Sequence, residues 1–284
     1  MTSKTLQLKT PLGYTIGVTK FIPQTYNRRT VVISSATGVL QKYYSKIALY
    51  FASLGYVVYT FDYYGIGSSN NSIKALKQNT CDLKTWSKND QASVVKFAKD
   101  SFPDHTLTLL THSLGGQLIA FNTHYNLIDS IITVASQSGY YKLWQGLDRF
   151  KMNIYWNALI PLTTALFGYF PTKKMGLFEN LPKKATQQWR RWANHPNYML
   201  GEFEQSTTNF SKITCPILAL SFPRDFYAPK ASVDWLANQY TKTNVERRHI
   251  IPEDLGIPDV KHFGFFRDTY KESLWHMAHD WITN

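Results

Sequence analysis

Hydrophobic and polar residues follow two different patterns along the chain, and the change comes near residue 30. Before that point they alternate over residues 5–9 and 14–21, with Pro11-Leu12-Gly13 between the two stretches, which predicts an antiparallel hairpin. After that point short apolar runs recur, which are typical of strands buried on both faces of a sheet. The runs are Thr30–Ser34, Tyr56–Phe61, Thr106–Leu110, Ile128–Ala135 and Pro216–Phe222, with a weaker run at Val245–Ile251.

Segments with helical spacing of apolar residues lie between several of these runs. They predict helices over residues 43–54, 89–99, 114–125 and 267–282. Strands that alternate with helices form right-handed βαβ units, in which neighbouring strands are parallel. The sequence therefore predicts the α/β class, with a mostly parallel sheet flanked by helices.

The alternation stops once, over residues 141–210. No clean apolar strand run is found there, and the segment is rich in aromatic residues and in Lys and Arg. This change in composition predicts a helical insertion, which divides the chain into a domain formed by 1–140 and 211–284 and the inserted segment 141–210.

The composition limits the class of protein further. Of the 284 residues, 44% are hydrophobic and 18% are charged, which excludes a largely disordered chain. The two cysteines, Cys81 and Cys215, cannot form a disulfide framework or a cysteine zinc cluster. Residues 1–9 lack the apolar core of a secretory signal, so a reduced, cytoplasmic setting is the simplest prediction.

The chain is strongly basic, with 31 Lys and Arg against 19 Asp and Glu and a net charge of +12. The basic residues are dispersed in pairs, which is typical of a solvated surface, and we expect no nucleic-acid partner. The net positive charge could still steer acidic substrates to the protein or simply keep it soluble.

The most apolar stretch is Ile154–Phe170. Pro161 and Gly168 interrupt it, so we expect no stable insertion into a membrane. Its basic flanks leave association with a membrane surface open, and a helix buried over the site is the favoured alternative.

A serine stands where a buried strand is predicted to turn into a helix. Residues 111–116 read Thr-His-Ser-Leu-Gly-Gly. A serine on so tight a turn has a strained backbone, and Gly115 and Gly116 leave room for it. We expect the Ser113 hydroxyl to project at the carboxyl end of the sheet, where open α/β folds bind ligands. The Leu114 amide, at the helix N-terminus, would then point at an anion beside Ser113.

A nucleophilic serine needs a base and a group that orients the base. Asp225 comes directly after a buried strand, and His262 lies in a loop before the last predicted helix. Asp254 and Asp259 compete with Asp225, but both fall close before His262 rather than after a strand. The sequence therefore favours Ser113, Asp225 and His262 as the catalytic residues.

The other histidines have weaker support. His112 adjoins the serine but should point away from it on the turn, so we expect a structural, hydrogen-bonded residue. No metal site is predicted, because the remaining histidines stand in no metal-binding pattern. They are His105, His124, His195, His249, His276 and His279.

Five short motifs stand at or near the ends of the predicted strands. They are Ser35–Val39 followed by Tyr43-Tyr44, Phe61–Ser68, His112–Gly116, Asp225–Pro229 and His262–Arg267. These motifs cover about residues 30–135 and 214–270 and resemble those of the α/β-hydrolase superfamily. Within it, the chain is similar to a group of bacterial predicted hydrolases with little assigned biochemistry.

The resemblance implies a sheet of about eight strands with a helical cap inserted after the sixth, here residues 141–210. It also implies a nucleophile elbow at Ser113, with His262 as the base and Asp225 as the residue that orients it. The order Ser, Asp, His along the chain is that of the α/β hydrolases.

The same resemblance implies an oxyanion hole formed by backbone amides. Leu114 supplies one, and the loop after the strand at 30–34 supplies the other, for which we choose Thr37 with Gly38 next. One departure is Thr111, because the residue two before the nucleophile is usually glycine in this family.

These expectations predict a serine hydrolase that cleaves a carboxylic ester, a thioester or a related acyl compound through an acyl-enzyme on Ser113. The aromatic insertion predicts a small-molecule substrate with an apolar group, contacted by Gly38, Trp144, Trp156 and Tyr227. No metal or organic cofactor is needed. An acyltransferase with the same triad and a non-catalytic binding protein are the alternatives, and the sequence leaves the oligomeric state open.

Overall fold

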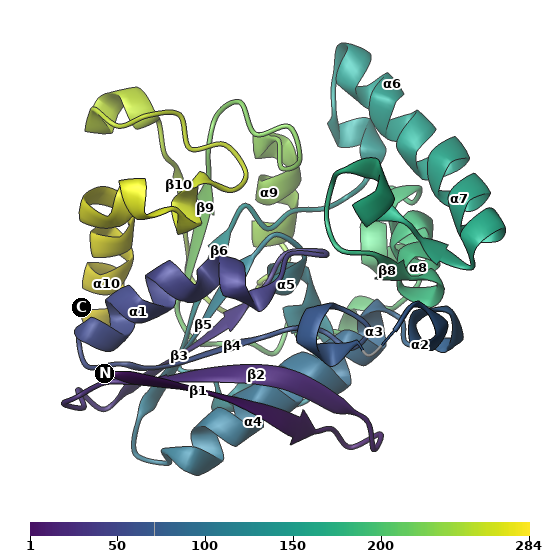
Figure 1. The fold of residues 1–284 in the computed structure, drawn as a ribbon. Coiled ribbons are helices and arrows are strands. Elements are labelled where there is room, and N and C mark those ends of the chain that lie inside the picture. Colours follow the sequence, from purple (N-terminus) through teal and green to yellow (C-terminus); the bar gives the residue numbers. More distant parts are fainter. Residues whose placement is uncertain (71) are drawn as a thin grey trace.

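An eight-stranded sheet forms the centre of the computed structural model, which describes residues 1–70 and 72–284 (Figure 1). Its strands are β1 (Thr2–Lys9), β2 (Thr15–Ile22), β3 (Arg29–Ser34), β4 (Val57–Phe61), β5 (Thr106–His112), β6 (Ser130–Val134), β9 (Ile217–Ser221) and β10 (Val245–His249). They lie side by side in the order β1-β2-β4-β3-β5-β6-β9-β10. The six strands from β4 to β10 in this order are parallel, and β2 runs against both of its neighbours. The predicted parallel sheet of about eight strands is confirmed.

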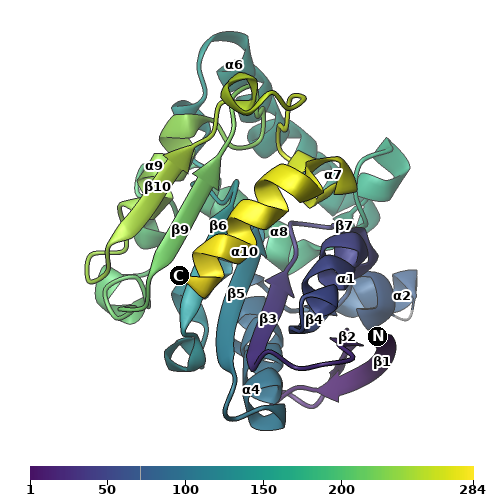
Figure 2. The same ribbon diagram turned by 90° about the vertical axis from the view of Figure 1, so that its left-hand side faces the viewer.

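Helices cover both faces of this sheet (Figure 2). On one face α1 and α10 bury Phe51 and Ile282 against the sheet, and on the other face α4 and α5 bury Val95 and Leu114. Because both faces are covered, the inner parallel strands are largely apolar, as the runs in the sequence indicated. The edge strand β10 is only half-buried and carries charged residues. The helices outside the insertion are α1 (Ser45–Ser53), α2 (Ile73–Gln78), α3 (Leu83–Thr85), α4 (Ala92–Ser101), α5 (Leu114–Gln117), α9 (Lys230–Ala237) and α10 (His276–Thr283).

The insertion follows the sixth strand, between β6 and β9, and is mainly helical. It also contains a small antiparallel pair, in which Tyr169 and Phe170 face Pro182 and Leu181. Its elements are α6 (Gly146–Ile154), α7 (Ile160–Phe167), β7 (Tyr169–Phe170), β8 (Leu181–Pro182) and α8 (Lys183–Ala193). A π-helical segment, Tyr155–Leu159, joins α6 to α7, so the two form one long helix. The division of the chain into two domains stays a prediction.

No helix within the described residues is both long and apolar enough to cross a membrane.

The helix predicted over 114–125 is shorter than expected. α5 ends at Gln117, and one 3₁₀ turn continues only to Phe121. The side chain of Asn209, from the far end of the insertion, donates hydrogen bonds to the carbonyls of Ile119 (2.9 Å) and Asn122 (2.7 Å). A longer helix would have used the first of these carbonyls itself, so a residue distant in sequence ends this helix.

A buried carboxyl group links the turn before β2, the loop after β4 and the segment before α4. Asp90, before α4, is fully buried and accepts hydrogen bonds from the Tyr14 hydroxyl (2.6 Å) and the Tyr64 amide (2.8 Å). No ion pair neutralises it within residues 1–70 and 72–284. Burial raises its pKa to about 7, and the two hydrogen bonds only partly oppose that rise.

This pKa predicts a pH-dependent stability. Between about pH 4 and 7 the folded chain keeps a proton on Asp90 that the unfolded chain has lost, so the free energy of unfolding falls as the pH rises through this window. Asp90→Asn should therefore gain stability relative to wild type by about 2–3 kcal/mol between about pH 5 and 8 in urea denaturation. Asp254→Asn, at an exposed position, is the control. If the difference in free energy of unfolding between Asp90→Asn and wild type did not change with pH, the raised pKa of Asp90 would be contradicted.

Candidate active site

The turn after β5 forces an unusual backbone on Ser113. Its φ is 51° and its ψ is −115°, although serine rarely adopts a positive φ. The Ser113 amide donates a hydrogen bond to the carbonyl of Val134 at the end of β6 (2.9 Å), which holds the strained turn against the sheet. Such strain costs on the order of 1–3 kcal/mol and is kept where the surroundings enforce it.

The two glycines after Ser113 are required by close contacts. A Cβ on Gly115 would lie 2.4 Å from the carbonyl oxygen of Ser34, and one on Gly116 would lie 2.3 Å from the Ser136 Oγ. The expectation that these glycines make room for the turn is therefore confirmed. Thr111 fits where a glycine is usual, because its buried hydroxyl donates to the Ile132 carbonyl within the sheet (3.3 Å).

Asp225 and His262 come together at the carboxyl edge of the sheet. The His262 Nδ1 lies 2.9 Å and 3.0 Å from the two carboxylate oxygens of Asp225, and both side chains are buried. The amides of Tyr227 and Ala228 also donate to the Asp225 Oδ1, at 2.9 Å and 3.0 Å. Because the carboxylate can only accept, this network places a proton on Nδ1 and leaves Nε2 as the acceptor in the neutral ring.

The loops that carry these two residues are strained and tied together. Arg224 and Lys261, which directly precede Asp225 and His262, both have positive φ values, of 56° and 51°. The Arg224 guanidinium, in the first loop, pairs with Glu253 (2.7 Å) and Asp259 (2.8 Å), in the second. Asp259 is therefore occupied by an arginine, and Asp225 is the carboxylate that contacts the imidazole. Strain of this kind gathers at functional sites.

Gln137 is a site residue that the sequence analysis missed. Its side-chain amide lies 3.4 Å from the Ser113 Oγ, and its Nε2 donates to the Tyr227 carbonyl (3.1 Å). Within residues 1–70 and 72–284, the Ser113 Oγ has no other hydrogen-bond partner, and it is not bonded to His262. Gln137 follows β6 by a few residues, so its place at the same edge of the sheet was the available signal.

The protein does not use the amides expected to form an oxyanion hole for its own hydrogen bonds in the described residues. Among the described residues, neither the Thr37 amide nor the Leu114 amide donates to a protein group. Thr37 lines the same cavity as Ser113, and Leu114 begins α5 directly after it. Gly38 has a φ of 67°, and a Cβ there would lie 2.9 Å from Phe178. It lines a neighbouring groove rather than this cavity.

His112 links the loop of His262 to Tyr44 and, through Tyr44, to the loop after β3. Its Nε2 lies 2.9 Å from the His262 carbonyl, and its Nδ1 lies 2.9 Å from the Tyr44 hydroxyl, which also accepts from the Ala36 amide (2.9 Å). Burial, helped by the nearby His262, holds the pKa of His112 well below its usual value, so the ring is neutral. The residue is buried and hydrogen bonded, as expected of a structural histidine, and it does not line the cavity that contains Ser113.

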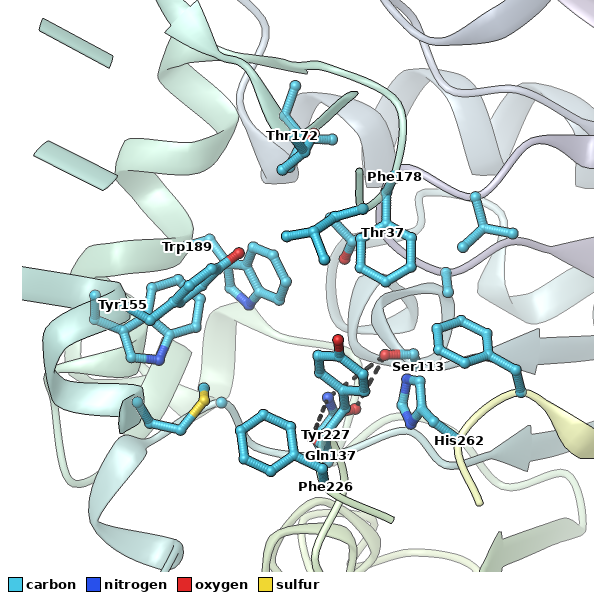
Figure 3. Close-up of a pocket in the computed structure, with 18 of the residues that line it drawn as sticks. Thr37, Ser113, Gln137, Tyr155, Thr172, Phe178, Trp189, Phe226, Tyr227 and His262 are labelled. Atoms are coloured by element: carbon cyan, nitrogen blue, oxygen red, sulfur yellow. Dashed lines mark hydrogen bonds between the residues drawn. The ribbon is translucent and has the colours of Figure 1, made fainter. Parts of the chain in front are cut away.

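A cavity of about 220 Å³ opens over Ser113 and His262 (Figure 3). Most of its remaining wall is apolar, and much of it comes from the insertion. Trp144, Trp156 and Tyr227, which the sequence analysis expected to contact substrate, all line it. In Figure 3 Tyr155 and Trp189 lie across the cavity from Ser113. No three His, Cys, Asp or Glu side chains of the described chain gather in a way that would hold a metal ion.

Comparison with known families identifies the relationship. The sequence model of the "Alpha/beta hydrolase family" matches residues 41–270. The chain belongs to this family. No curated protein matches the chain in a sequence search.

Solved α/β-hydrolase structures share the fold at low sequence identity. DcsB, solved in complex with its substrate analogue, is 15% identical, with a TM-score of 0.69 and 99% of each chain covered. An esterase of Pyrococcus furiosus is 14% identical, with a TM-score of 0.65 and coverage of 99% of this chain and 91% of that one. A thermostable carboxyl esterase of Bacillus coagulans is 16% identical, with a TM-score of 0.62 and coverage of 100% and 98%.

The hydrogen bonds of His112 predict a stability effect. His112→Phe keeps an aromatic ring of similar size but leaves the Tyr44 hydroxyl and the His262 carbonyl without their buried partner. The free energy of unfolding should fall by about 1–3 kcal/mol in urea denaturation. His124→Phe is the control, because that ring makes no hydrogen bond within the described residues. Equal stability of the two variants would show that the chain of hydrogen bonds contributes nothing.

Proposed function

We propose that this α/β hydrolase is a serine hydrolase that cleaves a carboxylic ester, a thioester or a related acyl compound with an apolar group. The observation that carries the proposal is the position of a strained serine beside an aspartate-bound histidine, on the wall of one largely apolar cavity. The two esterases of similar structure share only the fold with this chain at 14% and 16% identity, so the activity is argued from the site.

In the proposed reaction the Ser113 Oγ turns about its Cα–Cβ bond from Gln137 to the free Nε2 of His262. The imidazole takes its proton while the oxygen attacks the acyl carbon. Asp225 stabilises the imidazolium through the Nδ1 proton, and the amides of Thr37 and Leu114 stabilise the oxyanion. The imidazolium then protonates the leaving alcohol or thiol, and the ester left on Ser113 is the acyl-enzyme.

Water completes the cycle in the proposed mechanism. His262 removes a proton from the water, which attacks the acyl carbon, and the carboxylic acid leaves as Ser113 regains its proton. If an alcohol or amine takes the place of water, the same intermediate yields a transferase. Supplying acceptor alcohols and comparing transfer with hydrolysis separates these two activities.

Ser113→Ala should abolish the reaction. The variant lacks the oxygen that forms the acyl-enzyme, so kcat/KM for a soluble ester should fall by about 10⁴-fold or more, and labelling by a fluorophosphonate should be lost. Ser35→Ala is the matched control, because the Ser35 hydroxyl is buried in the loop after β3 without a hydrogen-bond partner in the described chain. Folded wild-type protein that takes up no label would instead support the non-catalytic binding protein.

Met152 should set the length of the acyl group. Its side chain lines the cavity from α6, so Met152→Ala enlarges the space and Met152→Trp fills it. In a panel of esters of increasing chain length, the ratio of kcat/KM for long over short esters should rise for alanine and fall for tryptophan, by about tenfold in each direction. Met175→Ala, outside the cavity, should leave the ratio unchanged. An apolar acyl site would be excluded if the ratio shifted in the same direction in both Met152 variants. It would also be excluded if the wild-type rate did not increase for acyl chains longer than acetate.

A further inference from the structure

The long helix formed by α6 and α7 exposes large apolar side chains along its outer side. Figure 1 shows this helix at the edge of the molecule, away from the central sheet. The exposed fractions are large for such residues: Leu147 77%, Phe150 61%, Ile154 44%, Leu162 68% and Leu166 73%. We call these five residues the outer stripe.

The outer stripe is continuous because its spacing is helical. Its residues follow one another at intervals of three, four, eight and four, and the exposed Ala158 fills the longest interval. The opposite side of the helix is buried, with Ile160 and Thr164 among the packed residues. The helix is therefore apolar on two sides, and the protein itself covers only one of them.

A continuous apolar strip differs from scattered exposed residues. Leu12 and Leu255, for example, are also exposed, but Leu12 lies on a turn and Leu255 ends a short 3₁₀ helix, and neither belongs to a long apolar strip. Isolated residues of this kind are normal on a soluble surface, whereas a continuous strip marks a surface that another phase or molecule covers.

The charges around the outer stripe indicate what covers it. Lys142 and Arg149 lie near its first residue, and Lys174 follows its last. The only acidic residue on the whole helix is Asp148, which pairs with Lys151 (3.0 Å). The stripe is thus an apolar strip with basic ends, and this pattern complements the acyl chains and negative headgroups of an anionic lipid surface.

We propose that the outer stripe docks the protein on the surface of an anionic lipid bilayer. The helix lies in the plane of the headgroups, with its apolar side chains among the acyl chains and its basic ends against phosphate. A second copy of the chain fits less well, because apposed stripes would bring like-charged ends together. A single convex helix also offers little flat area to a protein partner, whereas a bilayer adapts to it.

Docking would place the membrane beside the cavity. Met152 and Trp156 line the cavity from the same helix whose other side carries the outer stripe. This part of the inference rests on the proposed function: a lipid-borne acyl substrate would have only the thickness of one helix between the bilayer and Ser113. The docking itself does not depend on catalysis.

The test is binding of the full chain to vesicles. Wild type and Ser113→Ala should float with vesicles of equal parts phosphatidylcholine and phosphatidylglycerol, and bind pure phosphatidylcholine about tenfold or more weakly. The double variant Leu162→Glu/Leu166→Glu should lose about tenfold or more of the binding to anionic vesicles. The matched control Leu12→Glu/Leu255→Glu adds the same charge elsewhere and should bind like wild type.

Activity is measured on the same proteins. The stripe variant should hydrolyse a short soluble ester like wild type, and should lose rate only on an ester embedded in anionic vesicles. Binding that the stripe variant retains, or binding that both double variants lose equally, would overturn the proposal. The proposal would also be overturned if wild type formed a dimer and bound no vesicles, and the stripe variant were a monomer. Vesicle binding by a protein that cleaves no ester would overturn the proposed function and leave the docking surface intact.

Discussion

The backbone of Ser113 is the constraint on which the rest of the site depends. Its positive φ is possible only because the chain leaves β5 and enters α5 with two glycines pressed against Ser34 and Ser136. Those contacts come from the end of β3 and the loop after β6, on the two sides of β5, so the spacing of the parallel sheet sets the position of the hydroxyl. The regular, buried centre of the sheet thus supports an irregular turn at its carboxyl edge.

Two further loops must reach the same edge, and buried polar contacts hold them there. Arg224 ties the loop of Asp225 to the loop of His262, and His112 holds the His262 backbone from below. The buried Asp225 carboxylate needs no cation, because two amides and one imidazole satisfy it. Among residues 1–70 and 72–284 the Nε2 of His262 has no hydrogen-bond partner, as the proposed chemistry requires.

The insertion after β6 adds the apolar wall of the cavity and, on its far side, the outer stripe. A helix that packs on a protein core has one apolar face, and the helix formed by α6 and α7 has two. Its composition alone resembles that of a fully buried helix, because periodicity cannot tell an apolar face that meets protein from one that meets another phase. The sequence favours a buried helix, and the structure buries only one side of it.

The sequence by itself determined the α/β class, the strands, most helices and the strained turn at Ser113. It also singled out Asp225 and His262 as candidate catalytic partners of Ser113. These features have local causes: apolar runs, helical spacing, small residues at a turn and a residue's place after a strand. The tertiary structure decided the contact of Gln137 with Ser113, the partners of His112, the early end of α5 at Asn209 and the exposed side of the long helix. Each of these features depends on contacts between groups that are far apart in the chain. Such contacts produce no periodic pattern in the sequence of either segment.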